Sequence, residues 1–271
     1  MKNKSPRTKL AGLFATICCA LASVAFAVES EPTPHGEPVA PPSYQLVFSD
    51  DFSTDPNTNG NWTVFRRQDN PNREGYWDST QHVWYLTTRF FNLACAAFAN
   101  YELTATNWKV DFKYRVDNGP GGADGFVFMF YKDKSAYELR PPDSGTYMAF
   151  QTRNPDNSKN PVPGYGLQFD TYQYRGCDPL LENYVAIVQN VICHSAQVYR
   201  PFDKIDDNTW HSVEFTFNNG HVACTVDGSA VEGATISDPD YSHTGIGLGA
   251  GTGASVSNQI IDDFQIWIAT E

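Results

Sequence analysis

The stretch that decides the fold runs from Gly121 to Phe130 and reads Gly-Gly-Ala-Asp-Gly-Phe-Val-Phe-Met-Phe. It places one carboxylate, that of Asp124, on a glycine-rich corner directly before an apolar strand. A second segment, Gly164 to Tyr172, reads Gly-Tyr-Gly-Leu-Gln-Phe-Asp-Thr-Tyr. A short acidic side chain at such a corner accepts hydrogen bonds from the hydroxyls of a polyol. Together the two segments predict a β-sandwich that binds a sugar.

The first 27 residues predict a cleaved secretory signal peptide. A basic region precedes an apolar run from Leu10 to Phe26, and small residues lead to cleavage after Ala27. A membrane anchor would need about 20 apolar residues, and this run is shorter and is followed by Glu29. We therefore expect a secreted protein, extracellular or periplasmic, with no membrane span.

The remaining chain divides once. Residues 28–43 contain five prolines and little to bury, which predicts a linker. No second break in composition follows, so residues 44–271 are expected to form one domain, a normal size for an all-β fold.

The mature chain is strongly acidic. The full sequence has 19 basic and 31 acidic residues, and residues 1–27 hold four basic and no acidic ones, so 15 minus 31 leaves −16. Nucleic acid is not an expected partner, because phosphate binding requires clustered Lys and Arg. The acidity either keeps a secreted protein soluble or reflects oxygen-rich cation sites.

Four cysteines remain after cleavage, which allows three pairings. Cys177 and Cys193 flank a strand-sized segment, and we predict that they form a disulfide whose loop closure contributes about 3 kcal/mol. Cys95 and Cys224 lie among small apolar residues. For these two, buried thiols and a second disulfide both remain open.

Short runs rich in aromatic and β-branched residues fill the domain, separated by turn residues. Charged and apolar side chains alternate from Val110 to Val116, and Asn218-Asn219-Gly220 and Val226-Asp227-Gly228 are hairpin signals. Two packed antiparallel sheets explain this pattern, and the first and last strands are expected to pair. The predicted strands are Tyr44–Phe48, Trp84–Thr88, Phe90–Ala99, Lys109–Val116, Gly125–Tyr131, Tyr147–Thr152, Gly166–Tyr172, Tyr184–Asn190, His211–Asn218, His221–Val226, Gly245–Ala250 and Ile260–Ala269.

The order of these motifs resembles the legume-type (L-type) lectins and their bacterial and archaeal relatives in the concanavalin A-like superfamily. The resemblance covers residues 44–271 and is carried by Ala123-Asp124-Gly125, Phe169-Asp170-Thr171-Tyr172, Asp178-Pro179 and Tyr184-Val185-Ala186-Ile187, with Gly245 to Gly253 and Ile261-Asp262-Asp263-Phe264 near the end. It implies an all-β, concanavalin A-like jelly-roll sandwich of two antiparallel sheets and a glycan or polysaccharide as partner.

By this resemblance, Asp124 accepts hydrogen bonds from sugar hydroxyls, often across a cis peptide, at a corner completed by Gly125. Tyr172 and Tyr174 are candidate rings for stacking on a pyranose. Gly251, Thr252 and Gly253 match a loop that closes the far side of the sugar pocket with backbone donors. The alternative is that Asp124 only begins a turn, since Asp-Gly is common in turns.

The resemblance also implies a Ca²⁺ site in the loop after the second motif. Asp170 and Asp178 match its carboxylate ligands, Tyr172 matches a residue that offers its carbonyl, and Asn183 stands where a histidine ligand is expected. Gln168 and Tyr174 replace further ligands, so a second, transition-metal site is expected to be absent. Calcium remains a candidate cofactor. The alternative is that no ion is bound and that this is a loop held by the disulfide, with its acidic side chains exposed to solvent.

The same sandwich hosts glycoside hydrolases, which need two carboxylates about 5 Å apart for retaining chemistry. The matching strand reads Gln168-Phe169-Asp170-Thr171-Tyr172, and both flanking positions lack a carboxylate. We therefore predict a carbohydrate-binding protein that is not an enzyme. The alternatives are a hydrolase whose acids come from different strands and an adhesive module of the laminin-G kind.

Overall fold

The structure, a computed structural model, describes residues 43–117, 122–179, 183–203, 205–235 and 245–270. The predicted signal peptide 1–27 lies outside the described residues, as do residues 28–42 of the predicted linker and Gly121. Residues 42–271 form one compact unit, and the description below concerns that unit.

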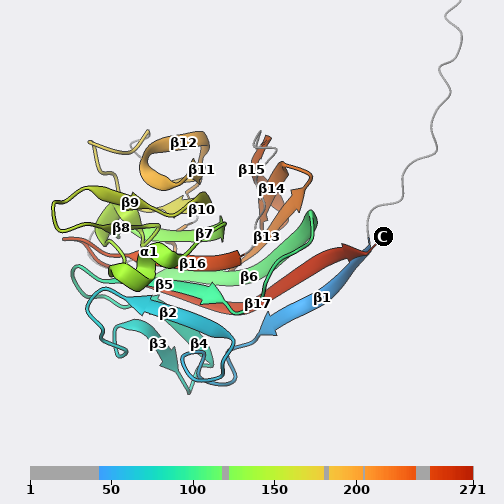
Figure 1. The fold of residues 1–271 in the computed structure, drawn as a ribbon, viewed down its shortest axis with the longest axis horizontal. Helices are drawn as coiled ribbons and strands as arrows, with labels where there is room; N and C mark the ends of the chain where they lie inside the picture. The colour runs from blue at the N-terminus through green and yellow to red at the C-terminus, as the bar shows by residue number, and fades with distance from the viewer. Residues whose placement is uncertain (1–42, 118–121, 180–182, 204, 236–244, 271) are drawn as a thin grey trace, which may run out of the picture. The chain divides into compact units, whose positions relative to one another are not determined.

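Two large antiparallel sheets make up most of this unit (Figure 1). The eight-stranded sheet has the order β15-β14-β13-β6-β17-β4-β3, with β1 also paired to β17. Its strands are β1 (Ser43–Asp50), β3 (Glu74–Asp78), β4 (Val83–Thr87), β6 (Asn107–Asp117), β13 (His211–Asn218), β14 (His221–Val226), β15 (Ser229–Thr235) and β17 (Asn258–Thr270).

The seven-stranded sheet has the order β12-β11-β10-β7-β16-β5-β2. Its strands are β2 (Trp62–Arg66), β5 (Ala94–Ala99), β7 (Gly125–Tyr131), β10 (Gly164–Asp170), β11 (Tyr184–Gln189), β12 (Val191–Pro201) and β16 (Gly245–Gly251). The segment between β7 and β10 carries the short helix α1 (Ser135–Leu139), the 3-10 turn η1 (Gly145–Tyr147) and the ribbon of β8 (Gln151–Arg153) and β9 (Lys159–Pro161). The fold is therefore an all-β sandwich, as predicted.

The main core lies between the two sheets and is dominated by aromatic rings. Trp108 of β6 stacks on Phe217 of β13 with centroids 5.2 Å apart, and it meets Phe130 of β7 edge-on at 5.7 Å. Strand β7 is buried on both faces, because Val127 and Met129 pack under the β7–β10 segment against Tyr137 and Met148 among others. A strand covered on both faces reads as one continuous apolar run, which explains the sequence after Asp124.

The structure confirms the predicted hairpins and the pairing of the end strands. Ser43 pairs with Thr270 at the edge of the eight-stranded sheet. Asn219 and Gly220 have φ values of 47° and 86° between β13 and β14, and Asp227 and Gly228 adopt similar angles before β15. Consecutive positive φ values at the two central residues are those of the hairpin turns that match strand twist.

Two predicted strands have different limits. The run Phe90–Ala99 becomes a strand only from Ala94, because residues 90–93 form a turn bonded to Thr252 and Gly253. The run Tyr147–Thr152 is a strand only from Gln151, where β8 begins, since Tyr147 ends the 3-10 turn and Met148 and Ala149 have positive φ. The apolar side chains there are buried by a compact loop instead of by strand pairing.

The predicted Cys177–Cys193 disulfide is present. Cys95 and Cys224 are buried thiols on different sheets, in β5 and β14, which decides the alternative that the sequence left open. Burial raises the pKa of the Cys95 thiol to about 12. Within the described residues, no helix is long and apolar enough to cross a membrane.

Candidate functional site

Four hydrogen bonds to backbone atoms hold the Asp124 corner in place. The Ala123–Asp124 peptide is cis, and the Ala123 carbonyl accepts hydrogen bonds from Ser257 Oγ (2.9 Å) and Gln259 Nε2 (3.0 Å) beside and on β17. The Asp124 amide donates to the Gly251 carbonyl at 3.0 Å, and the Asp124 carbonyl accepts from Thr171 N at 3.1 Å. The backbone position of Asp124, and with it the starting point of its side chain, is thus fixed by these four hydrogen bonds.

The carboxylate of Asp124 is buried but incompletely bonded. The residue is 4% exposed, and its Oδ2 has no hydrogen-bond partner within the described part of the chain. Burial raises the pKa of Asp124 to about 7, against the opposing effect of a Gly253 backbone hydrogen bond. Buried polar atoms are almost always paired, so this oxygen marks a place where a ligand or water completes the structure.

Two hydroxyls near this corner share the same property. Thr171 directly follows strand β10, whose last residue pairs with Gly125 beside the corner. Thr146 lies in η1 next to Gly145, and a Cβ built on Gly145 would lie 4.0 Å from Asp124 Oδ2. Both threonines are 7% exposed, and neither Oγ1 has a partner among the described residues. Two residues next to the corner along the chain or across it thus carry hydroxyls without a partner among the described residues.

The glycines of β16 let the loop around η1 approach this corner. A Cβ at Gly251 would lie 2.7 Å from the Gly145 carbonyl, and one at Gly249 would lie 2.5 Å from the Met148 carbonyl. Because real Cβ atoms do not come this close, any side chain at these positions would push the loop away. The glycine run therefore has a packing role here.

An ionic clamp at Asp143 holds the other end of the same loop. Asp143 is 4% exposed and pairs with Arg153 at 2.9 Å and Arg67 at 3.4 Å. Gln151 Nε2 also donates to Asp143 Oδ2 at 3.1 Å. The loop that carries Thr146 is therefore fixed both on the sheet and at its own base.

Thr252, predicted to contribute to the sugar pocket, uses its donors within the protein. Its amide donates to the Leu93 carbonyl (3.0 Å), and its hydroxyl donates to the Phe90 carbonyl (2.6 Å). The residue that instead faces the carboxylate is Gly253, where a Cβ would lie 3.2 Å from Asp124 Oδ2. Of the three residues of the predicted loop, Gly253 therefore lies nearest the carboxylate, while Gly251 contacts Asp124 N and Gly145.

The two predicted stacking residues follow Thr171 on an exposed loop. Tyr172 is 38% exposed and Tyr174 is 51% exposed. The Tyr172 amide donates to Asp170 Oδ1 at 2.9 Å, and the Tyr174 amide donates to Asp178 Oδ2. The backbone of this loop is therefore fixed by the two carboxylates while both rings remain accessible.

The predicted calcium carboxylates converge, but Asn183 does not join them. Tyr184 Oη lies 3.2 Å from Asp178 Oδ1 and 3.4 Å from Asp170 Oδ2. Burial raises the pKa of Asp170, and the nearby Asp178 carboxylate raises it further, as expected for two like charges without a cation. The amide of Asn183 instead donates to Asp206 Oδ1 at 2.7 Å, which argues against its predicted place in the site.

The fit of this pair to a hard cation rests on two carboxylates and neutral oxygens. No group of three His, Cys, Asp or Glu residues that could hold a metal occurs among the described residues. Gln168 Nε2 donates to Asp170 Oδ2 at 2.6 Å, so an amide stands where a further acidic ligand was expected. Asp170, Asp178 and the Tyr172 carbonyl remain the residues able to hold Ca²⁺, which accepts carboxylate and carbonyl oxygens together with water.

Three acids that stand next to another aspartate in the sequence, Asp50, Asp207 and Asp263, have hydrogen-bond or ion-pair partners in the structure. Asp50 accepts hydrogen bonds from Phe52 N, Asn59 Nδ2, Asn61 Nδ2 and Trp62 Nε1. Asp207 bonds His211, and Asp263 forms an ion pair with Lys113 at 2.5 Å. On β10 itself, Gln168 and Asp170 are each 1% exposed. Each of these acids thus has a partner within the protein.

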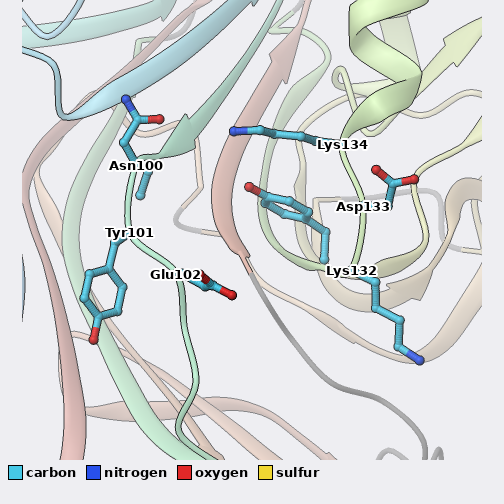
Figure 2. Close-up of a pocket in the computed structure, with 8 residues that line it drawn as sticks. Asn100, Tyr101, Glu102, Lys132, Asp133 and Lys134 are labelled. Atoms are coloured by element: carbon cyan, nitrogen blue, oxygen red, sulfur yellow. The ribbon is translucent and has the colours of Figure 1, made fainter.

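A hollow lies at the end of strands β5 and β7 that is far from Asp124 (Figure 2). It measures about 540 Å³ and is lined by Ala99, Asn100, Tyr101, Glu102, Tyr131, Lys132, Asp133 and Lys134. Because β7 runs from Gly125 to Tyr131 at about 3.3 Å per residue, roughly 20 Å separates it from the Asp124 corner. The Asp133 carboxylate accepts hydrogen bonds from Ser135 N and Oγ. The Asp124 corner, by contrast, combines unpartnered polar atoms with exposed rings.

Similar folds occur among solved structures. The VIP36 exoplasmic/lumenal domain, in its Ca²⁺- and mannose-bound form, is 14% identical with a TM-score of 0.59 over 76% of this chain and 82% of that one. The Bauhinia forficata lectin in complex with GalNAc is 14% identical with a TM-score of 0.61 over 84% and 100%. The Emp46p carbohydrate recognition domain, potassium-bound, is 14% identical with a TM-score of 0.54 over 78% and 90%.

The chain has the fold of the L-type lectins. No protein-family model matches the sequence, and no curated protein matches it significantly. The likeness extends to the L-type lectin fold and not to the bacterial or archaeal type that the sequence suggested. At such low identity the likeness establishes the arrangement of strands, and function must be argued from the residues of the site.

Several residues of this site were not found from the sequence. Ser257 and Gln259 position the corner, Asp143 anchors the loop, and Thr146 contributes an unpartnered hydroxyl. Each lies far along the chain from Asp124 and within no local motif. The glycine spacing in β16 was the one signal that a loop would pack closely against that strand.

Proposed function

We propose that this protein is a secreted, lectin-like carbohydrate-binding protein that holds a glycan without transforming it. The observation that carries the proposal is the buried Oδ2 of Asp124, which has no partner in the described structure and lies at a corner fixed by backbone contacts. This oxygen lacks a hydrogen-bond donor, and the hydroxyl of a sugar is a small donor that could supply the missing hydrogen bond.

The surroundings of Asp124 support the same ligand. The hydroxyls of Thr146 and Thr171 donate to or accept from further ring hydroxyls, and Tyr172 and Tyr174 offer aromatic faces to the apolar side of a pyranose. The solved structures with this fold include forms bound to mannose and to GalNAc. Whether the chain belongs to a bacterial or archaeal branch of this fold stays a prediction.

Calcium is the cofactor that this proposal includes. Structures of the same fold include a Ca²⁺-bound form and a metal-free form. Asp170, Asp178 and the carbonyl of Tyr172 would hold the ion, and its charge would offset the repulsion between the two carboxylates. With the ion bound, these three ligands would keep the Tyr172–Tyr174 loop beside Asp124.

Binding to an array of glycans, followed by calorimetry on the best ligand, tests the function. We expect the wild type to bind and Asp124→Asn to lose at least tenfold in affinity, because the amide removes the charged acceptor and places a donor in its position. Asp263→Asn, an acid on the eight-stranded sheet, is the matched control and should bind normally. Absence of binding by the wild type to every glycan would overturn the proposal, and release of reducing sugar would establish an enzyme instead.

A further inference from the structure

Two adjacent phenylalanines are exposed on the turn between β4 and β5. Phe91 is 54% exposed and Phe90 is 38% exposed, with ring centroids 6.2 Å apart. The Arg73 guanidinium lies 3.4 Å from the centroid of Phe90, so one face of that ring is covered. Exposed apolar side chains that adjoin one another are features found at interaction surfaces and ligand-binding grooves.

The turn that carries these rings is fixed to the wall of the Asp124 site. Asn92 N donates to the Gly253 carbonyl at 3.1 Å, and Thr252 bonds the turn through its amide and hydroxyl. Gln68 Nε2 donates to the carbonyls of Phe91 (3.2 Å) and Asn92 (3.1 Å) from the other side. The backbone beneath Phe91 is therefore held on both sides, so its ring is presented from a fixed base.

Gly253 connects the two features. It lies against the Asp124 carboxylate on one side and bonds Asn92, the residue after Phe91, on the other. Gly253 is thus the link through which the turn of Phe91 adjoins the Asp124 corner. Because the turn is already ordered, contact with it costs little conformational entropy.

We infer that Phe90 and Phe91 form a second subsite, which stacks on the next sugar ring of a glycan held at Asp124. The inference rests on the proposed function and extends it to the substrate class, an oligosaccharide in preference to a free monosaccharide. The subsite gives affinity through ring stacking and makes no demand on hydroxyl configuration, so Asp124 determines which sugar binds and Phe91 favours a longer chain.

Calorimetry with paired ligands tests this inference. The probes are the methyl glycosides of mannose, glucose, galactose and N-acetylgalactosamine, each compared with a disaccharide that ends in the same sugar. For the sugar that binds, we expect the wild type to favour the disaccharide about threefold to tenfold, the range of an aromatic contact. Phe91→Ala should abolish that preference and leave monosaccharide affinity within twofold, whereas Phe91→Tyr should retain it.

Leu46→Ala, which removes another exposed apolar side chain from β1 of the eight-stranded sheet, is the control and should change neither affinity. Equal affinity of the wild type for both ligands, or an unchanged preference in Phe91→Ala, overturns the subsite and leaves the sugar site at Asp124 standing. Absence of binding to both members of every pair, together with absence of binding to every glycan of the array, overturns the proposed function itself. The thermal transition of each variant verifies that it is folded.

Discussion

Gly253 lies in contact with the unpartnered oxygen of Asp124, because a Cβ built on Gly253 falls 3.2 Å from Oδ2. We predict that Gly253→Ala weakens glycan binding about tenfold by occupying the space where a sugar hydroxyl would approach. The free energy of unfolding should change by less than about 1 kcal/mol, as for most surface changes. Gly228→Ala is the contrasting control, since φ is +74° and a methyl there meets nothing within 4 Å: it should lower stability and leave binding unchanged.

The titration of Asp124 should make binding depend on pH. Burial raises the pKa of Asp124 to about 7, while sugar hydroxyls that donate to the carboxylate favour its charged form. The complex therefore has the lower pKa, and binding releases a proton. We expect affinity to be highest above pH 7 and to fall by up to about tenfold per pH unit below it. Calorimetry between pH 5.5 and 8.5 measures this dependence. An affinity that does not change between pH 6 and pH 8 would contradict the prediction.

Calcium should stabilise the fold through Asp170 and Asp178. A ligand that binds only the folded state raises the melting temperature with its concentration. We predict that EDTA lowers the melting temperature and that excess Ca²⁺ restores it, whereas Asp178→Asn abolishes the response and Asp263→Asn retains it. The absence of any shift at saturating calcium would exclude a structural ion at this pair.

The Asp143 clamp should affect both stability and binding. Asp143→Ala removes the partner of Arg67 and Arg153 and loosens the loop that carries Thr146. We expect the free energy of unfolding to fall by about 1–2 kcal/mol and glycan affinity to fall severalfold. Urea unfolding and calorimetry on the same preparations measure the two effects. Loss of stability with unchanged affinity would show that the loop plays no part in binding.

His211 should contribute stability that disappears at alkaline pH. Burial lowers the pKa of His211, but its contacts to Asp227 at 2.8 Å and Asp207 at 2.9 Å outweigh burial, so the net pKa is raised. When the pKa is higher in the folded state, the stability that the charged imidazole contributes is fully present below the unfolded-state pKa of about 6.5. This contribution is lost as the pH rises through the folded-state pKa. The melting temperature of the wild type should therefore decline above pH 6.5 more steeply than that of His211→Gln. Parallel curves for the two proteins would refute the assignment.

Local sequence patterns were enough to predict the sandwich, because strand alternation and turn chemistry are written in consecutive residues. The apolar run after Asp124 indicated a strand, and Asn219-Gly220 indicated a tight hairpin; both are present. The disulfide between Cys177 and Cys193 followed in the same way.

The finer geometry of the site depends on contacts between distant segments. Thr252 turns its donors to the 90–93 turn, and Asn183 turns to Asp206, for reasons that no local pattern contains. Phe90 was assigned to a strand because aromatic residues favour strands, but its carbonyl bonds Thr252 and ends that run in a turn. Tertiary hydrogen bonds decided these positions over local preference.

Strand β17 joins the Asp124 corner to the edge where the domain ends. Ser257 and Gln259, at its start, hold the Ala123 carbonyl, and Thr270 at its end pairs with Ser43. At about 3.3 Å per residue, its 13 residues extend roughly 40 Å. Ser43 and Thr270 therefore lie at one end of β17, and the Asp124 corner lies toward the other. Attachment to a surface through either of these residues would leave the corner pointing away from that surface, available to glycans on an opposing one.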